Sequence, residues 1–484
     1  MKSQAKTESD DNASQLRRDE RGMTGKDWWV MAALMVGIML SPLNVMFTSV
    51  ALPSMRDAFQ VNVEQAAWIG TAYFIPSVAL MPFQSQLGQR WGFRRVYGFG
   101  LLVLALGAFL AALAPAFPWL LASRAIQGIG WAALYPLALI LINTQYPAAR
   151  QGEMVGLWES SVGLTTIIAP LIAGLLVQFL SWRSLYVMMG VVAAFGALLT
   201  RAVVPADSAG QQKAKSDWLN VLILTLAVLL SLLGITTRNL ALLALAVAAW
   251  ALWAWTAGRL RTPSIPPVIF ANRRFVSASV AANIRMLVAV AALTALPLFF
   301  EDVQGLSPTA VGSLMVVYSL FLFFGSWPGG RWSDRAGAAV PGAVGYVAMI
   351  IGVLMLLGLS YQLVVWFVAV ALAIRGLGAG LSQAPYAKAA TEAVLPEQKQ
   401  AAAGLYGTIR YSGLALGTGL VGVFLQTRLT DYDALSGGAA ALPAYRELWL
   451  VLAIILLAGL AATLIMARSR PAEPSLLVVQ DGSA

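Results

Sequence analysis

The chain has 484 residues, of which 59% are hydrophobic and only 11% are charged, and it contains neither Cys nor His. A soluble protein cannot bury so much apolar surface, so this composition indicates a protein whose solvent is lipid. The missing Cys and His exclude disulfides, thiolate chemistry, and the usual metal ligand and general base. We therefore expect no catalytic residue, no metal site and no cofactor.

Apolar segments long enough to cross a bilayer recur along the whole chain. A hydrocarbon core about 30 Å thick needs about 20 helical residues. By this measure we predict fourteen spans, near 28–52, 65–84, 96–114, 118–143, 154–180, 184–204, 218–236, 239–257, 276–300, 309–328, 339–359, 363–386, 402–426 and 447–467. The predicted fold class is an all-α polytopic membrane protein.

Lys and Arg gather in the connections on one side of the predicted spans. The connections on the other side contain only a few basic residues, namely Arg56, Arg183, Arg238, Arg428 and Arg446. Connections rich in Lys and Arg stay in the cytoplasm, so we expect both chain ends there. The formal charge of +10 is then mostly a topology signal, and we expect no nucleic-acid partner.

Two bland apolar spans, 218–236 and 239–257, lie between the two longest connections predicted on the cytoplasmic side. Removing them leaves six spans and six spans. We predict a cytoplasmic tail over 1–27, a six-helix bundle over 28–204, a linker with two extra helices over 205–275, a second six-helix bundle over 276–467 and a cytoplasmic tail over 468–484.

A basic, glycine-rich signature occurs once in each half. The segment 87–95 follows the second span of the first half, and 329–337 follows the second span of the second half. Duplicated bundles are typical of transporters in which one half rocks against the other. We expect the two loops to control this switching through Gly88, Arg90, Gly92, Arg94, Arg95, Gly330, Asp334 and Arg335.

The fourth spans of the two halves align by feature. Arg124 stands before Gly128 and Gly130 in one, and Arg375 stands before Gly376 and Gly378 in the other. A charged group inside lipid costs several kcal/mol, so each of these arginines needs a reason. Either it ties helices together through backbone carbonyls, or it takes part in transport.

Several stretches together resemble the major facilitator superfamily and, within it, the fourteen-spanner drug:proton antiporter branch that carries out multidrug efflux. They are Leu43 to Pro53, Gly88 to Arg95, Arg124 to Gly130, Ala169 to Gly174 and Pro267 to Phe275. The resemblance covers about 30–466. It implies a major-facilitator fold with two six-helix bundles plus two extra central helices, in a bacterial cytoplasmic (inner) membrane. It also implies roles for Pro170 and Gly174 in switching.

The chain departs from that branch where acids are usual. Asn44 stands in the first-helix signature and Gln89 in the loop signature, both at positions where the branch usually has an acid. Glu159 is then the clearest acid inside a span, and we expect it to couple proton movement to transport, together with Arg124. The alternative for Glu159 is a fixed ion pair with an Arg. Glu301 and Asp302 are either a solvated rim or a proton site at the outer gate.

Polar and aromatic side chains within the spans are candidates to line a central substrate cavity. They are Asn44, Trp131, Tyr135, Asn283, Arg285, Gln383, Tyr386 and Arg410. Plain helix packing is the alternative for each. Arg285 stands near the middle of its predicted span, with Asn283 nearby.

The leading hypothesis is a proton-driven secondary active exporter of hydrophobic or amphiphilic compounds, and not an enzyme. The partners expected are the small-molecule substrate, protons and the lipid bilayer, with a periplasmic adaptor left open. Export of an anionic amphiphile such as a fatty acid, lipid or siderophore is the alternative, favoured by intramembrane Arg and missing acids. An intramembrane enzyme and a non-transporting sensor are the remaining hypotheses.

Overall fold

The computed structural model describes residues 24–205, 217–260, 263, 265–360, 362, 364–395, 398–436 and 441–469. Every regular element in these ranges is a helix. Among the helices of these described ranges, thirteen are long and apolar enough to cross a membrane, or fourteen when one bent pair counts as a single span. The prediction of an all-α polytopic fold is therefore confirmed.

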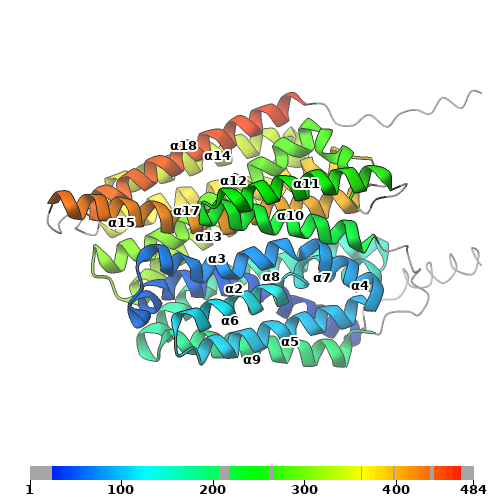
Figure 1. Cartoon of the computed structure of the whole chain (residues 1–484), viewed down its shortest axis with the longest axis horizontal. Helices are drawn as coiled ribbons and strands as arrows, with labels where there is room; N and C mark the ends of the chain where they lie inside the picture. The colour runs from blue at the N-terminus through cyan, green and yellow to red at the C-terminus, as the bar shows by residue number, and fades with distance from the viewer. Residues whose placement is uncertain are drawn as a thin grey trace, which may run out of the picture.

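The first group of helices, drawn in blue to teal in Figure 1, packs into one bundle. Its members are α2 (Gly25–Phe59), α3 (Val63–Ala79), α4 (Met81–Trp91), α5 (Phe93–Ala112), α6 (Phe117–Trp131), α7 (Leu134–Gln145), α8 (Ala148–Phe179) and α9 (Trp182–Val203). Helix α2 packs against α8 and α9, and α6 packs against α3 and α5. We call this group the first bundle.

The last group forms a second bundle of the same kind. Its members are α12 (Arg273–Asp302), α13 (Pro308–Ala336), α14 (Ala339–Met355), α15 (Val365–Leu381), α16 (Gln383–Glu392), α17 (Lys399–Ser436) and α18 (Ala441–Arg468). Short 3-10 turns, η1 (Pro267–Ala271) and η2 (Leu356–Gly358), precede α12 and follow α14. Helix α12 packs against α17 and α18, and α15 packs against α13 and α14.

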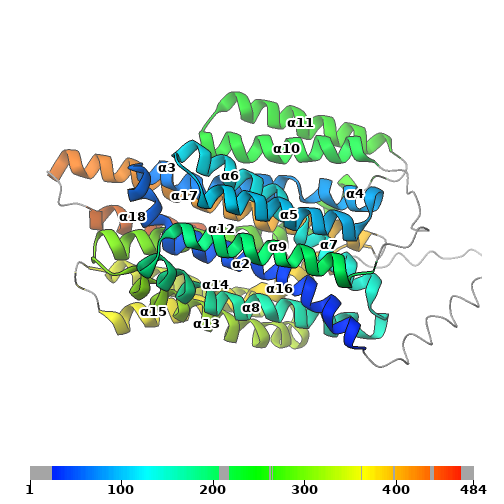
Figure 2. The same ribbon diagram turned by 90° about the horizontal axis from the view of Figure 1, so that it is seen from below.

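Helices α10 (Trp218–Thr237) and α11 (Leu240–Arg259) pack against each other. Figure 2 shows this green pair along one edge of the molecule, where α10 contacts α3, α4 and α17. A cavity of about 560 Å³ lies between α10, α12 and α17. This packing supports the division into 28–204, 205–275 and 276–467, which stays a prediction.

Several predicted straight spans are broken. The second span, expected over 65–84, is α3 and α4 with a bend of 49° between them. Pro82 in the first turn of α4 explains the bend, because proline lacks the N–H that would bond four residues back. The fourth spans of both halves are also split, into α6 with α7 and α15 with α16.

Gly25 and Arg468 begin α2 and end α18 at the same end of the bundles, the right-hand end in Figure 1. We call this the terminal end and the opposite end the distal end. The distal end holds the last turn of α2, the first turn of α3 and the α12–α13 connection.

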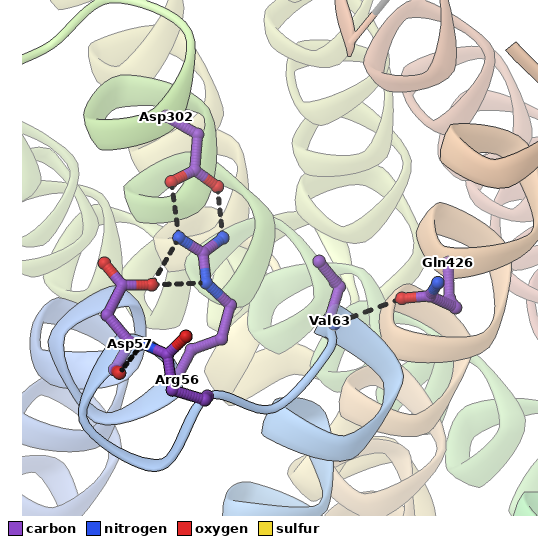
Figure 3. Close-up of polar contacts among 6 residues, drawn as sticks. Arg56, Asp57, Val63, Asp302 and Gln426 are labelled. Carbon is purple, nitrogen blue, oxygen red and sulfur yellow. Dashed lines mark hydrogen bonds and ion pairs between the residues drawn. The ribbon is translucent and has the colours of Figure 1, made fainter. Parts of the chain in front are cut away.

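The two bundles are tied together at the distal end. Asp302 at the end of α12 accepts hydrogen bonds from both terminal nitrogens of Arg56 at the end of α2, one of them at 2.7 Å (Figure 3). The backbone N–H of Val63 donates to Gln426 of α17 at 3.2 Å, and Figure 3 shows this contact close to the ion pair.

Further contacts extend this junction into the membrane. The hydroxyls of Thr71 and Thr418 lie 3.0 Å apart between α3 and α17. On the other side of the molecule, a Cβ at Gly174 would lie 2.6 Å from the carbonyl oxygen of Pro308, and Thr309 donates to the Gly174 carbonyl at 3.3 Å. Small residues let helix backbones approach this closely, so the two bundles are in direct contact toward the distal end.

Candidate functional site

The duplicated signature is almost entirely helical. It was predicted as a loop in each half, and that prediction is wrong in extent, because α4 runs to Trp91 and α5 starts at Phe93. Only Gly92 lies between them, with a φ of 97°. In the second copy the helix ends at Ala336, and Gly337 follows it with a φ of 77°. Residues with a Cβ resist such positive φ angles, so glycine is needed at both places.

The matching glycines fix how the two signatures correspond. With Gly92 opposite Gly337, Arg90 corresponds to Arg335, and Gln89 corresponds to Asp334. The side chain of Asp334 accepts a hydrogen bond from Lys388 of α16 at 2.6 Å. The first copy has an amide where the second has this ion pair.

The other basic residues of the signature differ in their contacts. Arg94 donates to the carbonyl of Arg201, in the last turn of α9, at 2.5 Å. A cation at a helix C-terminus is favourable because the last carbonyls there lack helical partners. Arg90, Arg95 and Arg335 are exposed. Gly88 faces inward instead, and a Cβ there would lie 2.7 Å from the ring of Phe93.

Arg124 is fully buried, and each of its three guanidinium nitrogens donates at least one hydrogen bond. Its Nε donates to the carbonyl of Ile69 at 3.0 Å, its Nη1 to Gln127 at 2.6 Å, and its Nη2 to Asn44 at 2.7 Å and Thr48 at 3.1 Å. Its guanidinium also lies over the ring of Tyr73, 4.6 Å from the centroid. Neutral oxygens hold this charge inside the first bundle, and Asn44 belongs to the same network.

Arg375 lies over Tyr318 in the second bundle, 4.5 Å from the ring centroid, and donates to the carbonyl of Ala289 at 3.0 Å. The alignment of the two fourth spans by feature set Arg375 opposite Arg124, but the two residues do not occupy equivalent positions. With Gly92 opposite Gly337, Gly107 is equivalent to Gly352. A Cβ at Gly107 would meet the backbone N of Gln127, and a Cβ at Gly352 would meet the backbone N of Arg375. Arg375 therefore occupies the position of Gln127, about one turn further along its helix.

An aromatic cluster joins the two bundles. Tyr411 of α17 lies with its ring centroid 5.5 Å from Trp131 of α6 and 5.5 Å from Tyr135 of α7. Tyr135 in turn lies 5.5 Å from Trp158 of α8. Of the residues predicted to line a cavity, Trp131 and Tyr135 thus lie together at the junction of the halves.

Arg410 and Asn283 belong to the second bundle beside this cluster. The guanidinium of Arg410 lies over the Tyr411 ring, 4.9 Å from its centroid. Asn283 donates to the carbonyl of Ile409 at 2.7 Å and to the hydroxyl of Ser412 at 2.8 Å, which ties α12 to α17.

Arg285 on α12 is 2% exposed, and its Nε and Nη2 atoms have no hydrogen-bond partner among the described residues. It lies twelve residues after the start of α12, about 18 Å along the helix and thus near mid-membrane. A buried guanidinium with two unpaired nitrogens is costly, so this arrangement needs a reason.

The remaining predicted residues lie apart. Tyr386 is buried inside the second bundle, where its hydroxyl lies 2.8 Å from that of Thr463. Gln383 begins α16 and is half-buried. The backbone of Glu159 lies in α8, but its side chain is outside the described part of the structure, so its role in proton coupling together with Arg124 stays a prediction.

Pro170 and Gly174 lie where α8 meets α13. A Cβ at Gly312 would collide with the carbonyl oxygen of Pro170, and Gly174 itself lies against Pro308. These residues therefore take part in the contact between the bundles.

Glu301 is half-buried beside the Arg56–Asp302 pair, and its Oε1 atom is buried with no hydrogen-bond partner in the part of the chain that the structure describes. Asp302 is held by Arg56, so the two neighbouring acids differ in their surroundings. Sequence reasoning counted Arg56 only as a topology marker. Its rarity on a side poor in basic residues was the signal that could have drawn attention to it.

The geometry described so far defines a class of protein. Two helical bundles, each with a glycine break between helices at one end, meet around an aromatic junction and are tied together at the other end. This is the architecture of a secondary transporter that switches between two states.

Comparison with known proteins gives the family. The model of the Major Facilitator Superfamily matches residues 34–418, so the chain belongs to this superfamily. It is a multi-pass membrane transporter of a family that is typically non-enzymatic.

Relatives of low identity span most of the chain. The riboflavin transporter RibZ of Clostridioides difficile (strain 630) is 26% identical over 410 residues, which cover 83% of this chain and 89% of the relative. The tetracenomycin C resistance and export protein of Streptomyces glaucescens is 24% identical over 432 residues, covering 85% and 78%. Multidrug resistance protein 3 of Bacillus subtilis (strain 168) is 25% identical over 423 residues, covering 84% and 82%.

The fold is similar to that of solved transporters. A crystal structure of a bacterial homolog to the human lysosomal transporter Spinster, in an inward-facing and occupied conformation, superposes with a TM-score of 0.71. It is 16% identical and covers 94% of this chain and 100% of the other. At this identity the likeness shows the fold alone.

Proposed function

We propose that the chain is a proton-driven exporter of hydrophobic or amphiphilic compounds, of the fourteen-spanner drug:proton antiporter branch, that works by alternating access. It would act in a bacterial cytoplasmic membrane with both chain ends in the cytoplasm. The distribution of Lys and Arg then assigns the distal end to the outside.

The observation that carries the proposal is the set of contacts between the bundles. The Arg56–Asp302 pair, the Val63–Gln426 bond and the Thr71–Thr418 contact lie toward the distal end. Single polar contacts of this kind can form and break as one bundle rocks against the other. The structure then represents the state that is closed to the outside.

The aromatic cluster supports an amphiphilic substrate. Trp131, Tyr135 and Tyr411 come from both bundles, so a compound that rests on them contacts each half. Aromatic faces bind apolar bodies without demanding one shape, as a broad substrate range requires. Relatives named as resistance and export proteins are consistent with this class of cargo.

The test is transport in proteoliposomes with an imposed proton gradient. Naphthalene derivatives that differ only in the head group supply the cargo: a quaternary ammonium, an alcohol and a carboxylate. We expect gradient-driven movement of at least one of them that a protonophore abolishes. Equal movement in protein-free vesicles, or insensitivity to the gradient, would refute proton-driven export.

Coupling is tested in the same vesicles with Glu159→Gln. The amide keeps the shape of the side chain but cannot release a proton. We expect gradient-driven transport to be lost while gradient-independent exchange of substrate remains. If the variant keeps the pH dependence of the natural protein, the coupling group is not Glu159, and Glu301 with Asp302 become the candidates.

A further inference from the structure

The buried arginines of the two bundles are satisfied to very different degrees. Arg124 uses all three of its guanidinium nitrogens on oxygens of Ile69, Gln127, Asn44 and Thr48. Arg285 is buried to the same extent, but its Nε and Nη2 bond to nothing in the described structure. Both guanidinium groups are charged, because arginine is not deprotonated in proteins.

The described residues around Arg285 do not neutralise it. Those that act on it electrostatically are Arg410 and the hydroxyls of Tyr406, Tyr318 and Tyr346, and no carboxylate of the described part of the chain is among them. A second guanidinium nearby makes the site more positive still. This position therefore attracts an anion that the described residues do not supply.

A purely structural role for Arg285 would look different. Arg375 shows the alternative in the same bundle, because its Nη2 ties α15 to α12 through the carbonyls of Val288 and Ala289. Asn283, two residues before Arg285 on the same helix, already ties α12 to α17. The connection between these helices does not need Arg285.

Arg410 links the surroundings of Arg285 to the aromatic cluster. Arg410, which acts on Arg285, lies with its guanidinium over the ring of Tyr411. Tyr411 touches both Trp131 and Tyr135 of the first bundle. An apolar body on these rings therefore lies beside a positive group deep in the membrane.

We propose that Arg285 binds an anionic head group, of the carboxylate class, on an amphiphilic substrate whose apolar body rests on Trp131, Tyr135 and Tyr411. The inference rests on the proposed function and adds the charge of the cargo. A planar guanidinium with two free N–H groups on adjacent nitrogens matches a carboxylate by paired hydrogen bonds. The binding occurs in a region of low dielectric, where such bonds are stronger than in water.

The test is equilibrium binding of 2-naphthoate, 2-naphthylmethanol and 2-naphthylmethylammonium to the purified protein in nanodiscs, followed by calorimetry. The three probes share one aromatic body and differ in charge. The variants are Arg285→Met, which keeps the apolar stem without the charge, and Arg285→Lys, which keeps the charge without the fork. Arg375→Met is the matched control, since it removes a buried guanidinium from the same bundle.

In the natural protein, we expect naphthoate to bind at least tenfold more tightly than the alcohol, and the ammonium probe to bind most weakly. Arg285→Met should reduce naphthoate affinity at least tenfold, to that of the alcohol, while alcohol affinity changes less than twofold. Arg285→Lys should fall between, and Arg375→Met should keep the preference for the anion.

Three results would overturn the proposal. One is that the natural protein shows no preference for naphthoate, as expected if an acid of the chain already neutralises Arg285. Another is that Arg285→Met lowers the affinity of all three probes equally, as a structural role predicts. The third is that none of the probes binds. Binding is measured without a gradient. A failure of proton-driven transport would therefore refute the proposed function, while the binding measurements would still test whether Arg285 binds the anionic head group.

Discussion

The Arg56–Asp302 pair gives the sharpest prediction about switching. Asp302→Ala removes both of its hydrogen bonds to Arg56 and leaves the neighbouring Asp57 as a partner for the guanidinium. The substitution therefore weakens the contact between the bundles without leaving an unpaired charge in its place. We expect it to favour the state that is open at the distal end.

The magnitude follows from the exposure of the two side chains. They are 17% and 30% exposed, so the pair is neither a fully solvated ion pair nor a buried one. Exposed pairs contribute about 0.2–1 kcal/mol, and hydrogen bonds to charged groups contribute about 1.5–3 kcal/mol. We take about 1–2 kcal/mol for this two-bond pair, which corresponds to a shift of about 5- to 30-fold in the equilibrium between the states.

The assay uses the absence of natural cysteines. Thr418→Cys places a single thiol at a position that is 4% exposed and faces Thr71 across the junction. Labelling by a membrane-impermeant maleimide then requires distal opening, so its rate follows the population of the open state. We expect Asp302→Ala to speed labelling of this thiol by about 5- to 30-fold.

Two controls separate opening from unfolding. Asp57→Ala removes only the pair within α2, and it should change the rate less than twofold. Ala108→Cys, in the core of the first bundle, should not be labelled faster in the Asp302→Ala background. The reasoning is refuted if Asp302→Ala and Asp57→Ala label Thr418→Cys at the same rate, or if Ala108→Cys speeds up equally.

Two further predictions concern the hinge and the topology. Gly92→Leu places a side chain on a residue with a φ of 97°, at a strain of about 1–3 kcal/mol, so transport should fall at least tenfold while substrate binding persists. The matched control Gly404→Leu, within a helix, should stay active. Normal transport by Gly92→Leu would show that this glycine is only part of a connector. Arg238 and Gly258 lie at opposite ends of α11. A membrane-impermeant thiol reagent added outside intact cells should label Arg238→Cys and not Gly258→Cys. Labelling of Gly258→Cys alone would show that the topology is inverted.

Hydropathy predicted most of the fold, because a lipid solvent restricts the chain to helices of about 20 residues. It could not predict the breaks within those helices. The bend between α3 and α4 depends on Pro82, yet Pro170 in α8 and Pro297 in α12 lie inside uninterrupted helices. Proline marks a place where a helix can bend, and the packing around it decides whether the helix does.

The candidate site was predictable only as a set of residues. Sequence placed Arg124 and Arg285 inside spans. It did not show that every guanidinium nitrogen of Arg124 is bonded, while Nε and Nη2 of Arg285 have no partner in the described part of the chain. That difference depends on partners from other helices, such as Asn44 and Ile69 for Arg124. No spacing along one helix carries this information.

The pseudo-symmetry of the bundles gives Arg285 its meaning. The first bundle places Arg124 over Tyr73 and the second places Arg375 over Tyr318, from positions about one turn apart on equivalent helices. A guanidinium over this tyrosine is therefore a shared feature of both halves, reached in two ways.

Arg285 has no counterpart of this kind. Pro53 and Pro297 lie near the distal ends of α2 and α12, and the residues twelve positions before them are Ser41 and Arg285. This register also sets Asn44 opposite Val288, and these two accept hydrogen bonds from Arg124 and Arg375 respectively. A charge that one half has and its equivalent half lacks cannot be explained by the needs of the repeated fold. It breaks the symmetry at mid-membrane beside the aromatic junction, where a transporter must distinguish its cargo.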